Sequence, residues 1–393
     1  MRILLHTGKG GVGKTTLAAA TALAAARRGH RVFLLSTDAA HGLGEVLGVR
    51  VGGEPVRVAA GVVAQASTAL DAIDSGWPQV RAWLRELLRG DADEVVVEEL
   101  LAVPGIEELV SLRALRAVEA SGDYDLCVVD CAPTGGALQW LRFPDALRAF
   151  MRHFFELERA GARWLRPIAR SVGAGRLVPS EALFEAVEAL QAGVDDVHRM
   201  LVDPARTTAR IVVEPERVVV DEALRAFAYL SLHGVATDAV IANRRLPALG
   251  DSPAARLLAG RAAREREQLE RIAHSFPLPL LSAPLCEREP IGTAALARLG
   301  EAVFGERDPA ARLAASRPLE VVERGAGAVV SIAVGAVARD DVEVDALVGG
   351  GAPHLLVRVR DARRRIALPA GLAGCTVERA RLARGRLEIE LAR

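Results

Sequence analysis

Short runs of apolar residues, each about as long as a strand, recur in the N-terminal part of the chain. They lie at residues 2–7, 31–36, 126–130 and 239–243. A segment rich in alanine and leucine, 17–28, follows the first run and has the composition of a helix. Continuous apolar strands separated by helices are typical of a parallel sheet buried on both faces. The pattern therefore predicts an α/β fold with a mostly parallel sheet and helices on both sides.

Two longer stretches, roughly 65–120 and 144–205, are predicted to be mostly helical. In the second stretch, apolar residues recur in steps of three and four, as on an amphipathic helix. One stripe comprises Leu147, Phe150, Met151, Phe154 and Leu157, and the other comprises Leu183, Val187, Leu190, Val194, Val197 and Leu201. We expect the two stretches to form a helical subdomain inserted into the sheet domain.

The pattern changes after residue 305. Pro309, Pro318 and several glycines indicate a linker over 306–325. Over 326–393 apolar and polar residues alternate, which predicts strands with one buried face. The expected organisation is thus an α/β domain at 1–305, the linker, and a small β-sandwich at 326–393.

The glycine-rich segment between the first strand and the first helix matches the phosphate-binding pattern GxxxxGK[ST]. Its candidate nucleotide-binding residues are Gly8, Lys9, Gly10, Gly11, Val12, Gly13, Lys14, Thr15 and Thr16. Glycines let backbone N–H groups turn inward around phosphate oxygens, and the helix N-terminus adds its positive end. Lys14 is expected to reach the β- and γ-phosphates, and the Thr15 hydroxyl to bind Mg²⁺. A glycine-rich turn without a ligand is the alternative, but the strand before and the helix after favour a phosphate site.

Composition draws attention to the same segment. Of 50 basic residues only two are lysines, Lys9 and Lys14. An ordinary phosphate loop needs no lysine at position 9. A second ammonium there can neutralise charge on a transferring phosphoryl group, within one subunit or across a dimer interface. The alternative is a solvated surface lysine, but its selection among so many arginines favours the functional interpretation.

Two aspartates follow predicted strands, at the carboxyl edge where such sheets bind ligands. Asp38 comes directly after the second strand and is a candidate to orient or deprotonate an attacking water, although an Asp in this place is often only a turn residue. Asp130 closes the apolar run at 126–130, which is the pattern of a Walker B acid that binds Mg²⁺.

Charge and cysteine content exclude several classes of protein. The 50 basic and 50 acidic residues cancel, which argues against binding to nucleic acid or anionic membranes. The four cysteines form no CxxC pair, as expected in a reducing compartment. No apolar stretch approaches the ~20 residues of a spanning helix, and the phosphate loop starts too early for a signal peptide. We expect a cytoplasmic protein that is not itself transmembrane.

Four motifs in order along the chain resemble those of the arsenical-pump and tail-anchored-protein-targeting ATPase family. They read KGGVGKTT, STDAAH, DCAPTGG, and TTARIVVEPERVVVDEALR ending in VIANRR, and the resemblance covers roughly residues 1–300. It implies the P-loop NTPase fold and a homodimeric deviant Walker A ATPase that uses ATP and Mg²⁺.

The resemblance also implies roles for single residues. Lys9 would be the signature lysine that reaches the partner's nucleotide, Asp38 the catalytic switch I aspartate, and Asp130 the Walker B and switch II acid. Glu216 and Asn243 would contact the nucleotide, with Asn243 at adenine. A side-chain amide both donates and accepts at a base edge, although a strand-end cap is the simpler role for Asn243.

The chain departs from the family pattern in places. Ala39 stands where switch I usually has proline, and Gly136 where switch II usually has histidine, which bears on coupling between the switches. The absence of a CxxC pair argues against a zinc clasp. Cys127 and Cys131 resemble small core residues, so arsenite binding is not expected either.

The C-terminal segment resembles the small-heat-shock-protein β-sandwich in IALP at 366–369 and GRLEIEL at 385–391. Such a module would bind or shield apolar surface, or act only as a structural cap. The targeting branch of the family holds apolar client helices in its helical subdomain. Here the candidate contacts are Phe150, Met151, Phe154, Phe155 and Trp164, although amphipathic stripes more often pack into a core.

The sequence thus predicts a Mg²⁺-dependent ATPase that couples its nucleotide state to the handling of an apolar client. One alternative is a partitioning or positioning ATPase that acts on DNA or membrane, but no basic patch or terminal amphipathic helix supports it. The other is a nucleotide-gated chaperone in which hydrolysis is incidental.

Overall fold

The computed structural model of the chain describes residues 1–37, 42–66, 106–132, 141, 181–248, 250, 253–325, 327–347 and 353–393. The strands of its N-terminal part are β1 (Arg2–Thr7), β2 (Val32–Ser36), β3 (Val56–Ala59), β4 (Val62–Ala66), β5 (Leu126–Asp130), β6 (Thr207–Val213), β7 (Thr237–Arg245) and β8 (Leu280–Pro284). The helices are α1 (Lys14–Arg27), α2 (Gly42–Leu47), α6 (Ile106–Ser121), α10 (Glu181–Val202), α11 (Arg217–Leu232), α12 (Pro253–Ser275) and α13 (Thr293–Phe304).

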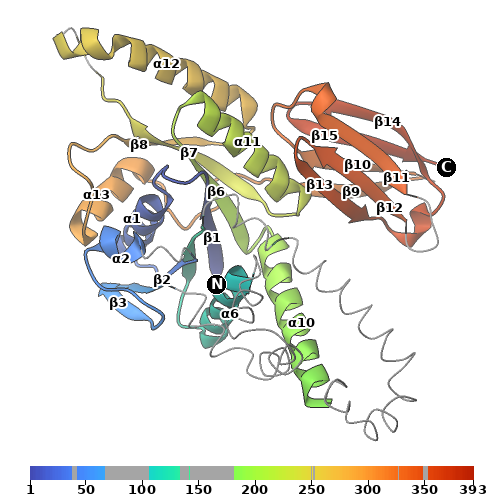
Figure 1. Cartoon of the computed structure of the whole chain (residues 1–393), viewed down its shortest axis with the longest axis horizontal. Helices are drawn as coiled ribbons and strands as arrows, with labels where there is room; N and C mark the ends of the chain where they lie inside the picture. Colours follow the sequence, from blue (N-terminus) through green and yellow to red (C-terminus); the bar gives the residue numbers. More distant parts are fainter. Residues whose placement is uncertain are drawn as a thin grey trace, which may run out of the picture.

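These strands form one sheet with the order β3-β4-β2-β5-β1-β6-β7-β8 (Figure 1). All neighbouring strands run parallel except β3 and β4. The predicted α/β fold is therefore confirmed. Because β1 lies between β5 and β6, the loop after β1 opens at the centre of the carboxyl edge, where such sheets bind ligands.

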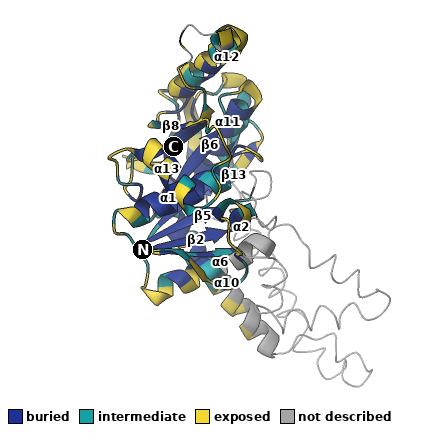
Figure 2. Ribbon diagram, turned by 90° about the vertical axis from the view of Figure 1, so that its left-hand side faces the viewer, coloured by how far each residue is buried: buried dark blue, intermediate teal, exposed yellow. Residues whose placement is uncertain are grey.

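Alternate side chains of each strand enter two different layers of the core. Leu4, Leu34 and Val128 pack with α1, α2 and α13 on one face. Ile3, Phe33 and Cys127 pack on the other face with side chains of α6, α10 and α11. Figure 2 shows the central strands as buried and much of α12 as exposed. The two apolar layers explain why the sequence shows continuous apolar runs instead of alternation.

The strands predicted at 2–7, 31–36, 126–130 and 239–243 are all present, and α1 begins three residues before the predicted 17–28 helix. Of the predicted helical stretches, α6 and α10 are described, and Val194, Val197 and Leu201 of the second stripe are buried. The first stripe, together with Phe155 and Trp164, lies outside the described residues.

The C-terminal part is a β-sandwich. One sheet has the order β14 (Thr376–Ala383), β15 (Arg386–Ala392), β10 (Gly327–Ala333), β9 (Leu319–Arg324), and the other the order β11 (Val342–Leu347), β12 (His354–Val359), β13 (Ala362–Ala367). All their pairings are antiparallel. Strand β9 lies inside the segment predicted as linker, because Pro318 and Gly325 flank a strand there and do not mark irregular chain. We call residues 319–393 the C-terminal module.

The segment between α13 and β9 is bound to strands β6 and β7 by hydrogen bonds. The buried guanidinium of Arg210 donates to the Asp238 carboxylate at 3.2 Å and to the Ala311 carbonyl at 3.0 Å. The same carboxylate accepts from Arg2 at 3.0 Å and from the Leu313 backbone N–H at 3.3 Å. The segment is therefore bound to the sheet along its path. Among the described helices, none is both long and apolar enough to cross a membrane.

Candidate active site

The glycine-rich loop after β1 adopts a conformation that side chains would obstruct. Gly8 has φ +152°, and a Cβ there would lie 2.3 Å from the Val212 carbonyl oxygen. Gly13, the residue before α1, has φ +87°, and its Cβ would lie 2.4 Å from Nδ2 of Asn243. Gly11 has φ +84° and open space on its Cβ side. The loop therefore packs closely against β6 and β7 while its outer turn is free to surround a phosphate.

The two lysines lie in contrasting environments. Lys14 begins α1, is only 6% exposed, and donates to the backbone carbonyl of Lys9 at 3.3 Å. Lys9 itself is exposed. The side chain of Lys14 thus folds back over its own loop, whereas that of Lys9 extends into solvent.

Asp130 lies at the end of β5, next to the phosphate loop, and is fully buried. The Ser36 hydroxyl donates to its carboxylate at 3.2 Å. Thr37 joins the ends of β2 and β5, because its backbone N–H donates to the Asp130 carbonyl at 2.9 Å and its hydroxyl accepts from the Ala132 N–H at 3.1 Å. Asp38, Ala39 and Gly136 lie outside the described residues, but Thr37 fixes the backbone directly before Asp38.

Asn243 is held against the phosphate loop by an irregularity in β7. The pairing of β7 with β8 shifts between Ala242 and Arg245, and Arg244 has φ +55°. Such bulges re-aim side chains and are frequent beside active sites. Asn243 is 6% exposed, and its Nδ2 donates to the Val12 carbonyl at 2.7 Å.

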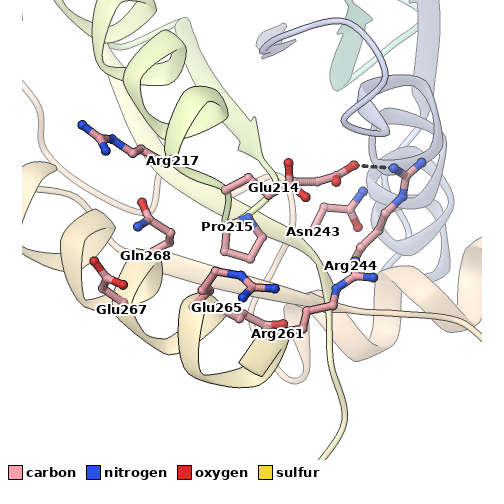
Figure 3. A pocket seen from close by; sticks show the side chains of 11 residues that line it. Glu214, Pro215, Arg217, Asn243, Arg244, Arg261, Glu265, Glu267 and Gln268 are labelled. Atoms are coloured by element: carbon pink, nitrogen blue, oxygen red, sulfur yellow. Dashed lines mark hydrogen bonds and ion pairs between the residues drawn. The ribbon is translucent and has the colours of Figure 1, made fainter. Parts of the chain in front are cut away.

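A cavity of about 610 Å³ opens beside Asn243. From one side it is lined by the β6–α11 connection and the end of β7, and from the other by α12 (Figure 3). Glu214 and Arg244 form an ion pair across the two strand ends. Glu216 and Asn243, which the sequence resemblance assigns to the nucleotide, line this same cavity.

The α12 side of the cavity was not foreseen from the sequence. It contributes Arg261, Arg264, Glu265, Glu267 and Gln268. Glu265 accepts from Arg245 at 2.6 Å and from the Leu246 backbone N–H at 3.2 Å, which fastens α12 to the end of β7. Gln268 is 8% exposed, and within the described structure its Oε1 has no hydrogen-bond partner. Charged residues at helical spacing usually indicate a solvated face, so the pattern gave no sign of this cavity.

The thiols and the histidine near the site are held uncharged. Burial, with a smaller contribution from the Asp130 charge, raises the pKa of the Cys131 thiol to about 12, and burial also raises that of Cys127. His6, next to the loop on β1, contacts the Thr21 hydroxyl at 3.1 Å; burial and then the charge of Arg210 lower its pKa to about 3. No cluster of three or more His, Cys, Asp or Glu side chains suited to a metal occurs in the described parts.

Comparison with known proteins assigns both parts of the chain. Residues 1–305 match the family model described as anion-transporting ATPase, and residues 325–391 match an HSP20-like domain found in ArsA. A protein named "Putative arsenical pump-driving ATPase" from Chlorobaculum tepidum is 30% identical over 378 residues, 95% of this chain and 92% of the relative. Protein Rv2184c of Mycobacterium tuberculosis is 35% identical over 413 residues, 99% and 95% of the two chains. ATPase GET3 of Malassezia globosa is 26% identical over 306 residues, 77% and 90% of the two chains.

Proposed function

The chain belongs to the anion-transporting ATPase family and hydrolyses ATP, and on this premise we propose that it acts as a Mg²⁺-dependent homodimer whose nucleotide state controls an apolar client protein. The observation that carries the dimer is the contrast between the buried Lys14 and the exposed Lys9 in one phosphate loop. Lys14 serves the phosphates of its own subunit, and Lys9 those of the partner.

The cavity beside Asn243 receives the base of the nucleotide. Its position next to the loop allows the phosphates to lie on Gly10–Thr16 while the base enters between β7 and α12. The buried Oε1 of Gln268 supplies an acceptor that matches the amino group of adenine. Pro215 offers the apolar surface on which a base can rest. Nδ2 of Asn243 donates to the Val12 carbonyl, so the amide oxygen of Asn243 is the atom that would accept a hydrogen bond from the ligand.

The residues beside the phosphates fit Mg²⁺. The Thr15 hydroxyl and the Asp130 carboxylate are oxygen ligands, which this ion prefers, and it usually takes few ligands from protein. Bound there, Mg²⁺ would neutralise charge on the β- and γ-phosphates. Asp38 orients the attacking water, and the hydrogen bonds of Thr37 hold the backbone before it in place.

We propose a protein client and not arsenite, because Cys127 and Cys131 are buried and their pKa values are raised. A thiolate, not a thiol, binds such ligands. The client would bind through apolar residues that the sequence suggests for it, such as Phe150 and Phe154, which lie outside the described residues.

Replacement of Lys9 tests the dimeric site. Lys9→Arg should lower turnover by about 10³-fold, since a planar guanidinium replaces a compact ammonium at the transferring phosphoryl group. ATP binding, measured by titration calorimetry, should change little. The control Lys14→Arg should weaken binding itself.

A mixed dimer shows in which subunit Lys9 acts. One subunit carries Lys9→Arg and the other Asp130→Asn. If Lys9 serves the partner, one of the two sites retains both groups and about half of the activity remains. An inactive mixed dimer, or full turnover of Lys9→Arg alone, would contradict the proposal.

A further inference from the structure

Two helices that line the base cavity, α11 and α12, have their C-terminal ends in contact with the C-terminal module. Glu216 and Arg217 lie at the start of α11 and line the cavity, whereas Ala228 and Leu232 near its end belong to the apolar core of the module. Both of these residues are at most 1% exposed. Arg364 of β13 donates to the carbonyl of Leu232, the last residue of α11. One helix of four turns therefore joins the cavity to the β-sandwich.

The second helix, α12, makes the same connection. Gln268 lines the cavity, and Ser275, two turns further on, ends the helix. The carbonyl of Ser275 accepts from the backbone N–H of Ala336 in the module at 3.0 Å. A Cβ on the adjacent Gly335 would lie 2.8 Å from the Ser275 oxygen and within 3.4 Å of Leu224 and Phe227. The backbone of the module is thus in direct contact with the backbone at the end of α12.

The two helices are also bound to each other between these ends. Arg271 of α12 forms an ion pair with Asp221 of α11. The rings of Phe227 and Phe276 meet edge to face at 5.6 Å. Since packed helices shift as units and do not deform continuously, a displacement at the module is carried to the cavity wall.

We infer that docking of the C-terminal module positions α11 and α12 and thereby sets the affinity of the cavity for the nucleotide base. The inference rests on the proposed use of this cavity by the base. Leu232, Arg364 and Gly335 are then positioning residues, because they touch the helices and not the nucleotide. By linkage, bound nucleotide stabilises the docked module to the same extent.

Arg364→Ala and Gly335→Ala test the inference in the full chain. The first removes the hydrogen bond to the end of α11, and the second forces the segment that follows β10 away from the end of α12. The probes are ADP with Mg²⁺ and inorganic pyrophosphate, which has phosphates but no base. We expect the dissociation constant of ADP to rise about threefold to tenfold and that of pyrophosphate to stay unchanged, with KM for ATP raised and kcat retained. Arg381→Ala is the matched control, because Arg381 pairs with Glu388 within the module.

Gln268→Leu separates this inference from the proposed function. If Gln268→Leu weakens ADP and not pyrophosphate, but both module variants bind ADP normally and keep their circular dichroism, the coupling is refuted and the base site stands. If Gln268→Leu also binds ADP normally, the proposed base site is refuted, and so is the inference that rests on it. If Gly335→Ala fails to fold, Arg364→Ala alone decides. Equal losses for ADP and pyrophosphate would overturn the inference, since they would indicate a change in the phosphate loop.

Discussion

At the scale of single residues, several polar side chains are confined where water cannot reach them. His6 is the clearest case, because it is fully buried beside the phosphate loop and next to the positive charge of Arg210. A charged imidazole would lack solvation there, so the folded protein keeps His6 neutral. The unfolded chain has no such restriction, which makes stability depend on pH.

Acidification should therefore destabilise the fold through His6. As the pH falls below about 6.5 the unfolded chain takes up a proton that the folded chain refuses until its pKa of about 3, so the loss at pH 5 is about 2 kcal/mol. Urea titrations at pH 7 and pH 5 measure it. In His6→Gln the difference between the two pH values should shrink by about this amount, and an equal difference in both proteins would refute the assignment.

At the scale of elements, helices α1 and α13 pack closely against each other. Gly300 of α13 faces α1 so closely that a Cβ would lie 2.4 Å from the Ala20 carbonyl oxygen and 2.8 Å from Cβ of Ala24. The many alanines of α1 allow this approach. Because α1 begins at the phosphate loop, the contact also holds the start of that helix.

Gly300→Ala should force the two helices apart. Overpacking of this kind costs about 1–3 kcal/mol of folding free energy. Thermal and urea unfolding of the variant measure the loss. Gly52→Ala serves as the control, since its Cβ would meet nothing within 4 Å. Equal stability of the two variants would show that the helices can separate without cost.

The elements show which features the sequence can reveal. The strands at β1, β2, β5 and β7 and the phosphate loop were predicted, because apolar runs and a glycine pattern are local signals. Strand β6 was not, since Arg210 interrupts its apolar run, and Asp238, which compensates that charge, lies in another strand. For the same reason, the bond from Asn243 to Val12 and the cavity beside α12 were missed: they depend on contacts between residues far apart in sequence.

At the scale of the whole molecule, the buried pair Arg210–Asp238 connects the sheet to the segment that leads into the C-terminal module. Both side chains are fully buried, and the guanidinium lies 5.4 Å from the centre of the Phe304 ring. The backbone at Ala311 and Leu313 completes the network. The buried ion pair thus fixes the course of the segment that connects the ATPase part to the C-terminal module.

Asp238→Ala should leave the Arg210 charge buried without its partner, at a cost of about 3–5 kcal/mol. Limited proteolysis should then cut the segment 306–318 sooner, because Leu313 loses its acceptor. Asp125→Ala provides the comparison: its pair with Arg31 is largely exposed, so its loss should destabilise the protein far less than the loss of Asp238. A wild-type cleavage rate in Asp238→Ala would exclude the anchoring role.

The burial of Ala228 and Leu232 in the sandwich core also bears on how the chain can be divided. A protein cut after residue 305 would present this end of α11 to water, together with Tyr229 beside it. This apolar surface, buried in the full chain, would then be exposed and would favour self-association. The C-terminal module therefore covers an apolar end of α11, and substitution of Ala228 and Leu232 by polar residues would be the first step in preparing the ATPase part without the module.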